Sequence, residues 1–205
     1  MKTKLIYLLL ASALVGGSSI AFAQKAQSAS PYVSQVWNPD LGNGMYKNPV
    51  INADYSDPDV VCVGDDYYMT ASSFNCIPGL PILHSKDLVN WEIIGHAVTK
   101  LQPESEFDQP SHGNGVWAPC ISYHNGEFYI YWGDPDYGVF MVKTKDPAGK
   151  WDDPVCVIPG KGMIDTSPLW DEDGRVYLVN GWANSRNRFA SVITVRELNA
   201  DGTKA

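Results

Sequence analysis

The sequence predicts an all-β fold, because short apolar runs alternate with glycine-containing turns and one plan repeats along the chain. Each repeat has an apolar run, a polar turn that contains Gly64, Gly126 or Gly174, and an aromatic or β-branched run. Asn125 precedes Gly126 and Asp173 precedes Gly174, and such dipeptides favour tight hairpins. After the first 23 residues no stretch keeps a helical spacing of apolar residues. The predicted hairpins are 57–70, 117–132 and 165–179.

The first 23 residues read as a targeting segment. Lys2 and Lys4 precede an apolar run from Leu5 to Val15, and small residues end the segment at Ala23. This is the pattern of a secretory signal peptide, and the run is too short to span a membrane. The sequence therefore predicts a signal peptide at 1–23, a periplasmic or secreted protein, and no membrane insertion.

Residues 24–47 are polar and rich in Ser, Asn, Gly and Pro, and they predict a leader that lies across the surface of the following domain. That domain is expected to span 48–205. Within it a second pair of strands is predicted after each hairpin, in segments 81–94, 139–151 and 191–202.

Four strands in about 50–60 residues form the pattern of a β-propeller blade. A β-sandwich also has short strands at regular spacing, but the aligned repeats favour the propeller. Three blades do not close a ring and would leave strand edges exposed. The sequence is therefore expected to be the front part of a longer protein.

Charge and aromatic content narrow the class of ligand. Without the predicted signal peptide, the 15 basic residues fall to 13 against 23 acidic ones, which gives a net charge of −10. Such a surface disfavours nucleic acid and anionic membranes as partners. The 7 Trp and 11 Tyr suit neutral, hydroxylated, ring-shaped ligands, such as an oligosaccharide or polysaccharide.

The cysteines do not indicate a zinc site, and an oxidising compartment permits disulfides with three possible pairings. Cys62, Cys76, Cys120 and Cys156 show no Cys-x-x-Cys spacing, so a zinc site is disfavoured and we expect buried free thiols. The sequence predicts no cofactor.

One residue from each repeat is expected to meet the others at the propeller axis. Alignment on the turn glycines places Asp57, Trp117 and Asp165 near the start of the first strand of each blade. First strands line the axis of a propeller, so these side chains are predicted to share a pocket. Two carboxylates and an indole can combine acid–base chemistry with sugar stacking.

Five ordered motifs carry a resemblance to a known family. They are NPVINADYSDPDV at 48–60, GDDYY at 64–68, LHSKDLVNW at 83–91, VWAP at 116–119 and GMIDTS at 162–167. Over about residues 47–205 the sequence resembles the N-terminal part of glycoside hydrolase family 43. The resemblance implies a five-bladed β-propeller, of which about the first three blades are present, and a β-xylosidase, α-L-arabinofuranosidase or arabinanase activity.

The resemblance also implies roles for four residues. Asp57 matches the general base, and Asp165 matches the carboxylate that orients the general acid and tunes its pKa. Phe74 and Trp117 match positions that line the subsite for the terminal sugar. The family hydrolyses glycosides with inversion, which needs room for a water between base and sugar. The sequence does not decide whether a calcium ion lies on the axis of the full-length protein.

The general acid of the family is a Glu at the start of the fourth blade, which is expected after Ala205. The segment by itself is therefore predicted to be inactive. One alternative is a non-catalytic, carbohydrate-binding propeller that has lost its acid. Another is a sucrose- or fructan-cleaving hydrolase, but its Asn-Asp-Pro-Asn-like motif matches Ser56-Asp-Pro-Asp59 poorly.

Other side chains compete for places in the site. Asp59 and Asp54 are rivals for the role of base, and Asp87 is expected to form a turn. The loop 112–115 and Trp182 are candidates for ligand-facing positions, because glycines let backbone approach a sugar closely.

Overall fold

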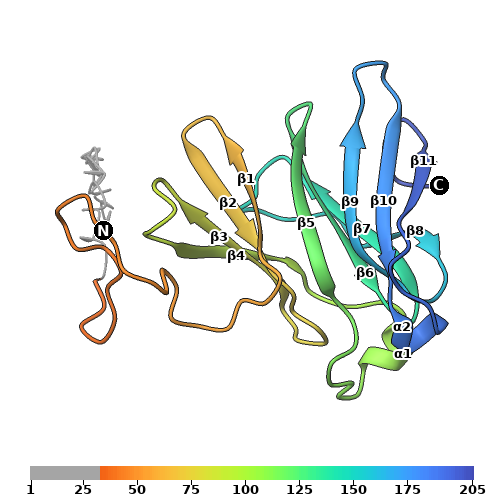
Figure 1. Ribbon diagram of the computed structural model, residues 1–205, viewed down its shortest axis with the longest axis horizontal. Coiled ribbons are helices and arrows are strands. Elements are labelled where there is room, and N and C mark those ends of the chain that lie inside the picture. The colour runs from red at the N-terminus through yellow and green to blue at the C-terminus, as the bar shows by residue number, and fades with distance from the viewer. Residues whose placement is uncertain (1–32) are drawn as a thin grey trace, which may run out of the picture. The chain divides into compact units, whose positions relative to one another are not determined.

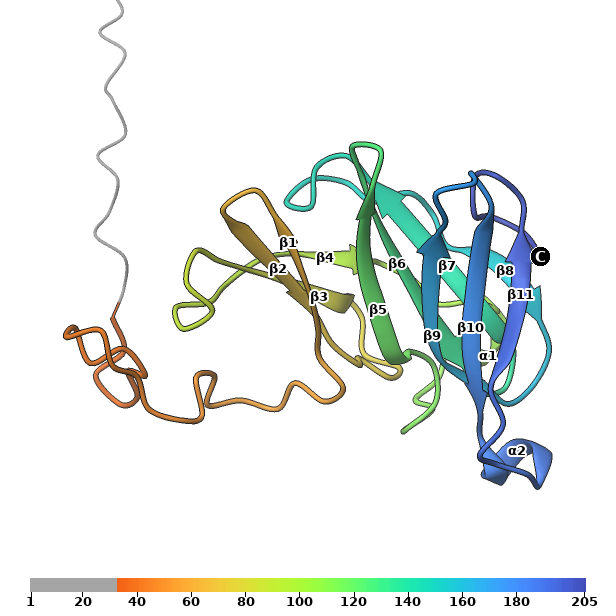
Figure 2. The ribbon, with the colours of Figure 1, turned by 45° about the horizontal axis from the view of Figure 1, so that its top comes forward.

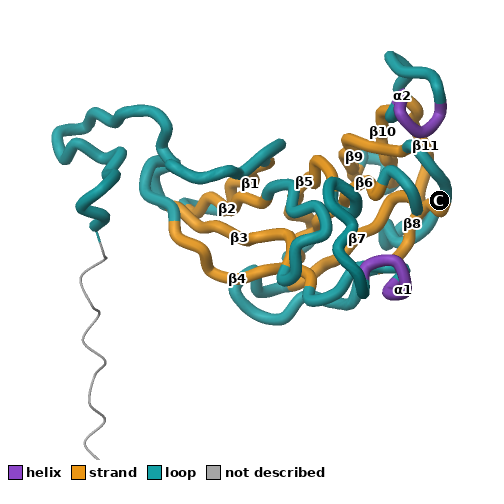
Figure 3. Tube along the Cα trace, turned by 90° about the horizontal axis from the view of Figure 1, so that it is seen from below, coloured by secondary structure: helices purple, strands orange, loops and turns teal. Residues whose placement is uncertain are grey.

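The computed structural model describes residues 33–205, so the predicted signal peptide and residues 24–32 of the leader lie outside the described part. The compact unit 35–205 contains three antiparallel sheets (Figure 1). The all-β class predicted from the repeats is confirmed. Figure 3 shows strands and loops throughout, with the two short helices α1 (Glu104–Phe107) and α2 (Asn184–Asn187).

Each sheet is a meander whose strands follow the order of the chain. The first sheet contains β1 (Asp59–Val63), β2 (Asp66–Thr70), β3 (Gly79–Ser85) and β4 (Glu92–Val98). The second contains β5 (Trp117–His124), β6 (Glu127–Asp134), β7 (Gly138–Thr144) and β8 (Val155–Pro159). The third contains β9 (Met163–Trp170), β10 (Val176–Trp182) and β11 (Thr194–Leu198).

The three predicted hairpins are confirmed, with turns at the predicted glycines. Gly64, Gly126 and Gly174 have φ of +64°, +83° and +84°. This left-handed backbone is accessible to glycine without the steric clash that a Cβ would cause. The strands β1–β2, β5–β6 and β9–β10 pair across these turns.

Two of the predicted second strand pairs differ from the structure. The strand β8 begins at Val155, beyond the predicted segment 139–151, because Thr144 turns the chain by donating from Oγ1 to the carbonyl of Lys150 at 2.8 Å. In the described residues the third sheet has the single strand β11 where the sequence predicts two. After β11 the chain folds into a local loop, in which Asn199 N–H donates to Lys204 O at 2.8 Å.

The first strands of the three sheets are neighbours. The strand β1 contacts β5, and β5 contacts β9, although roughly 50 residues of chain separate the members of each pair. Figure 2 shows the three strands side by side, with the later strands of each sheet leading away from them. This arrangement agrees with the prediction that the first strand of each repeat faces a common axis.

Apolar side chains cover both faces of the second sheet. One buried cluster lies against the first sheet and contains Ile82, Val116 and Ile130; another lies against the third sheet and contains Tyr131, Met141 and Leu178. Each such side chain contributes about 1.5–3 kcal/mol when it leaves water. Burial on both sides explains why nearly every side chain of β6 is buried and its sequence is a continuous apolar run. In β1, by contrast, half-buried and exposed side chains alternate.

The outward faces of the first and third sheets remain exposed in the described chain. Leu169 is 55% exposed and Val195 is 61% exposed. The prediction of buried thiols is wrong for Cys62, Cys76 and Cys156, which are exposed, although all four cysteines are free. Cys62 is exposed because it alternates with Val61 and Val63, and only the valine face of β1 is covered by the second sheet.

No helix in the described part of the chain has the length and the apolar character needed to cross a membrane.

Candidate active site

Asp57 lies two residues before β1 and is held by two hydroxyl groups. Ser72 Oγ donates to Asp57 Oδ2 at 2.8 Å, and Ser56 Oγ donates to the same oxygen at 3.2 Å. The carboxylate is exposed to solvent. Its orientation is therefore fixed while one face stays open to a ligand.

The same backbone strain recurs at the start of each sheet. Asp57, Ala118 and Asp165 have φ of +49°, +33° and +54°. For a residue with a Cβ this conformation costs about 1–2 kcal/mol, and such strain gathers at functional sites. Ala118 directly follows Trp117, so the strained position in the second sheet adjoins the predicted site residue.

Asp57 and Asp165 are close enough to interact electrostatically. Burial raises the pKa of the Asp165 carboxyl, and the negative charge of Asp57 raises it further. Asp57 precedes β1 and Asp165 lies in β9, and both of these strands contact β5. The fold therefore brings together two aspartates that are more than 100 residues apart in the sequence. The predicted convergence of these carboxylates is thus present in the structure.

Phe74 and Trp117 belong to segments that are joined by backbone hydrogen bonds. Phe74 N–H donates to Val116 O, and Val116 N–H donates to Phe74 O, both at 3.0 Å. Phe74 has φ of +50°, and its side chain is 36% exposed. Trp117 Nε1–H donates to Gly113 O at 2.7 Å, which fixes the indole edge. The two aromatic residues therefore stand on one bridge next to Asp57.

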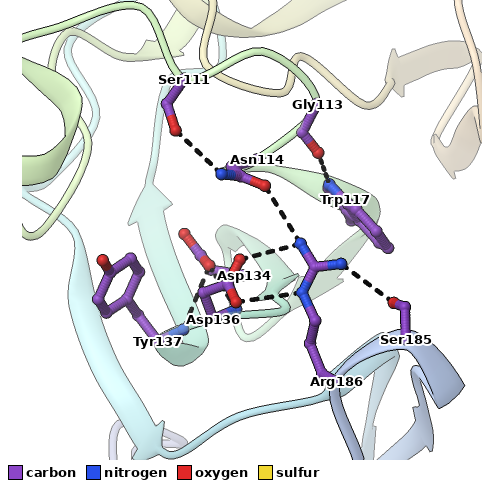
Figure 4. A network of polar contacts seen from close by, with 9 residues as sticks. All are labelled: Ser111, Gly113, Asn114, Trp117, Asp134, Asp136, Tyr137, Ser185 and Arg186. Atoms are coloured by element: carbon purple, nitrogen blue, oxygen red, sulfur yellow. Dashed lines mark hydrogen bonds and ion pairs between the residues drawn. The ribbon is translucent and has the colours of Figure 1, made fainter.

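A network around Arg186 supports one face of Trp117, as Figure 4 shows. The Arg186 guanidinium lies 5.4 Å from the centre of the Trp117 ring and binds Asp136 through Nε at 3.1 Å and Nη2 at 3.0 Å. Nη2 also donates to Asn114 Oδ1 at 3.2 Å. The predicted loop 112–115 therefore contributes by holding Trp117 through Gly113 and Asn114.

A buried carboxylate lies beneath this network. Asp134 ends β6, is 2% exposed, and accepts hydrogen bonds at Oδ1 from the N–H groups of Asp136 and Tyr137. Burial raises the pKa of Asp134 to about 6, although the two donated hydrogen bonds act against that rise. The group shapes the turn that presents Asp136 to Arg186.

Asp59, a rival for the role of base, and Asp87, the predicted turn residue, both have structural partners. Asp59 Oδ2 accepts a hydrogen bond from Ile121 N–H at 2.8 Å, which ties β1 to β5. Burial, with the nearby charge of Asp59, raises the pKa of the Cys120 thiol to about 11. Burial also acts to raise the pKa of Asp87, but hydrogen bonds from Asn90 and Val89 outweigh it and hold that pKa at about 2. The turn predicted at Asp87 is confirmed.

The remaining candidates are placed as follows. Trp182 ends β10, and its Nε1–H donates to Thr194 Oγ1 at 2.8 Å. Within residues 33–205 no three His, Cys, Asp or Glu side chains gather as metal ligands would.

A family model described as glycosyl hydrolases family 43 matches residues 46–205. The chain belongs to this family. The resemblance predicted from the five motifs is thereby confirmed.

Several curated proteins are similar to this chain. A β-xylosidase of Formosa agariphila is 37% identical over an alignment of 190 residues, which covers 88% of this chain and 31% of that protein. A non-reducing end α-L-arabinofuranosidase of Bacteroides ovatus is 40% identical over 147 residues, or 70% of this chain and 27% of that protein. The chain therefore spans about a third of the length of these relatives.

The fold is also similar to solved family 43 structures. A xylan β-1,4-xylosidase from Bacillus halodurans superposes with a TM-score of 0.62 and 33% sequence identity. The match covers 77% of this chain and 31% of that one.

The family motifs point to Asp57, Trp117 and Asp165 but not to the side chains that hold them. Ser72 is one of two adjacent serines, and no pattern distinguishes it from Ser73. Asp136 lies in the β6–β7 turn and Arg186 lies in α2, 50 residues later, and they meet only because the second and third sheets pack together. A single sequence does not indicate that an Asp and an Arg so far apart along the chain form an ion pair.

Proposed function

We propose that the protein containing this chain is an exported, inverting glycoside hydrolase that releases xylose or arabinose from plant oligosaccharides or polysaccharides. The observation that carries this proposal is the meeting of Asp57 and Asp165 beside Phe74 and Trp117. Membership of family 43 and the printed activities of its relatives support the same reaction and the same class of sugar.

In the proposed mechanism Asp57 acts as the general base. Its carboxylate accepts a proton from a water molecule as the water oxygen bonds to the anomeric carbon, on the face opposite the leaving group. The glycosidic C–O bond breaks, and a general acid gives a proton to the leaving oxygen. That acid is expected to be the family Glu predicted after Ala205, with Asp165 orienting it and tuning its pKa.

The aromatic residues would bind the terminal sugar. Phe74 is partly exposed, and Trp117 has one face against Arg186 and its indole edge fixed by Gly113. Rigid aromatic rings suit the apolar face of a pyranose or furanose, and little side-chain freedom is lost on binding.

We also propose that the three sheets are the first three blades of a five-bladed β-propeller. The neighbouring strands β1, β5 and β9 support a shared axis. The exposed apolar residues on the outward faces, such as Leu169 and Val195, support further sheets packing there. The structure of the full-length protein tests this proposal, since two more blades must close the ring.

The base assignment is tested with aryl β-xyloside and aryl α-arabinofuranoside substrates. In the full-length protein, Asp57→Asn is expected to lower kcat by about 10²- to 10⁴-fold, because the water loses its proton acceptor. Asp54→Asn changes the exposed rival carboxylate three residues earlier and is expected to leave kcat unchanged. Wild-type turnover by Asp57→Asn would show that Asp57 is not the base.

A carbohydrate-binding propeller is the second candidate, because the partly exposed Phe74 and the fixed Trp117 can hold a sugar without any general acid. This alternative predicts that the protein hydrolyses neither substrate. It also predicts that the protein binds xylo-oligosaccharides in calorimetry, and that Trp117→Ala weakens this binding. Turnover of either aryl glycoside by the wild-type protein would reject it.

A further inference from the structure

The Ser72 hydroxyl joins the first sheet to the second beside Asp57. Its Oγ lies 2.8 Å from Asp57 Oδ2 and 2.8 Å from the backbone nitrogen of Ala118. The backbone N–H can only donate, so the hydroxyl accepts that bond and keeps its single hydrogen for the carboxylate. The hydrogen bonds therefore run in one direction, from Ala118 through Ser72 to Asp57.

The local backbone of β5 frees the Ala118 N–H for this bond. The ladder between β5 and β6 is interrupted between Trp117 and Cys120, and Ala118 has φ of +33° inside the interruption. Pro119 follows and has no N–H to donate. The strained turn thus directs a donor of the second sheet toward the first.

Neighbouring hydrogen bonds fix Ser72 on both sides. Its own N–H donates to Ser56 O at 3.0 Å, in the residue just before Asp57. Two residues later, Phe74 and Val116 exchange a pair of hydrogen bonds at 3.0 Å. The hydroxyl is therefore held by backbone on each side and does not depend on a flexible side chain for its position.

We propose that Ser72 is a positioning residue that orients the Asp57 carboxylate and couples it to the backbone of β5. This inference rests on the proposed function of Asp57. Consecutive bonds with one direction polarise each other, which strengthens the donation to the carboxylate. Ser72 and Ser56 both address Oδ2, so Oδ1 is the oxygen that faces the attacking water.

The test compares Ser72 variants of the full-length protein on the aryl glycosides. Ser72→Ala is expected to lower kcat by about 10- to 100-fold, the equivalent of one hydrogen bond to a charged group. KM is expected to change by less than about threefold, because Phe74 and Trp117 still hold the sugar. Ser72→Thr keeps the hydroxyl and is expected to restore most of kcat.

Ser73→Ala is the matched control. Ser73 Oγ accepts a hydrogen bond from Leu80 N–H at 3.0 Å and is buried, but it makes no bond to Asp57. Its loss is expected to lower Tm without lowering kcat. If Ser72→Ala also lowers only Tm, or if a folded Ser72→Thr fails to recover kcat, Ser72 has no positioning role.

Should Ser72→Ala fail to fold, Ser72→Cys replaces it, since a thiol has nearly the same shape but is a weak donor. Full kcat in Ser72→Cys would overturn the inference. Failure of the proposed function gives a different result, because the wild-type protein would then hydrolyse neither aryl glycoside, and the positioning role would fall with it.

Discussion

At the scale of single residues, the site contains positions with a strained backbone, and hydrogen bonds offset the cost of that strain. Asp57, Ala118 and Asp165 each adopt a left-handed backbone at the start of a sheet. Ser72 then connects two of these positions directly, through the carboxylate of Asp57 and the N–H of Ala118. The strained backbone therefore directs the Asp57 carboxylate and the Ala118 N–H toward the Ser72 hydroxyl, between the first and second sheets.

The electrostatic contact of the two aspartates can be measured at this scale. Asp57→Asn removes the negative charge that, together with burial, raises the pKa of Asp165. The pKa of Asp165 is therefore expected to fall in the variant while staying above its ordinary value, since burial remains. Carboxyl NMR titration of the full-length protein measures it.

Asp59→Asn is the control for this titration, because Asp59 begins β1 two residues after Asp57 but binds Ile121 N–H. An unchanged Asp165 pKa in Asp57→Asn would show that the two carboxylates do not interact.

The sequence predicts Asp57 and Asp165 because each lies in an ordered motif, but it does not predict Ser72. A serine hydroxyl acts through its exact partners, and these belong to another sheet. The strained backbone at Ala118, next to Trp117, is likewise not predicted. It belongs to an interruption of the ladder between β5 and β6, which the turn glycines do not reveal.

At the scale of elements, local turn chemistry decided which predictions hold. The three glycine hairpins were predictable because their turns need a left-handed backbone at a defined position. The strand predicted after β11 is instead a loop closed by its own side chains, in which Asn199 Oδ1 accepts from Lys204 N–H at 2.9 Å. Asn and Asp compete with strand pairing in this way.

The β6–β7 turn gives a prediction about pH. The pKa of Asp134 is about 6 in the folded chain and 3.8 in the ordinary state, so the folded chain binds the proton more tightly. The contribution of this group to stability is therefore present below about pH 4 and is lost as the pH rises to about 6. By pH 7 the loss amounts to about 2–3 kcal/mol.

Asp134→Asn is expected to remove this loss, because its amide oxygen can still accept from Asp136 and Tyr137 N–H. Denaturant unfolding should show the variant gaining on the wild type between pH 4 and pH 7. Asp153→Asn removes the same charge from an exposed position and controls for net charge. An equal difference at both pH values would contradict the assignment.

At the scale of the whole unit 35–205, the second sheet holds the site together because both of its faces are buried. The first sheet packs on one side and brings Asp57, while the third packs on the other and brings Asp165. The apolar run of β6 indicated burial, but one sequence cannot say which sheet covers which face. That information lies in contacts between segments roughly 50 residues apart.

The spacing of the second and third sheets depends on Gly133. A Cβ at this position would lie 2.5 Å from Met163 O and 2.8 Å from Ile164 Cα, both backbone atoms just before Asp165. Gly133→Ala must therefore push β9 away from β6, at a cost of about 1–3 kcal/mol. Asp165 then moves relative to Asp57, so kcat/KM on the aryl glycosides is expected to fall about tenfold or more.

Gly126→Ala separates this displacement from simple destabilisation. Gly126 has φ of +83° at the tip of the β5–β6 hairpin, and a Cβ there meets no atom within 4 Å. An alanine with this backbone conformation costs about 1–2 kcal/mol, which is similar to the cost of Gly133→Ala. Gly126→Ala nevertheless leaves the contact between β6 and β9 intact. Thermal unfolding and kinetics of the two full-length variants should therefore show similar losses of Tm, with a loss of kcat/KM only in Gly133→Ala. Equal kcat/KM in both variants would mean that the distance between these sheets does not set the geometry of the site.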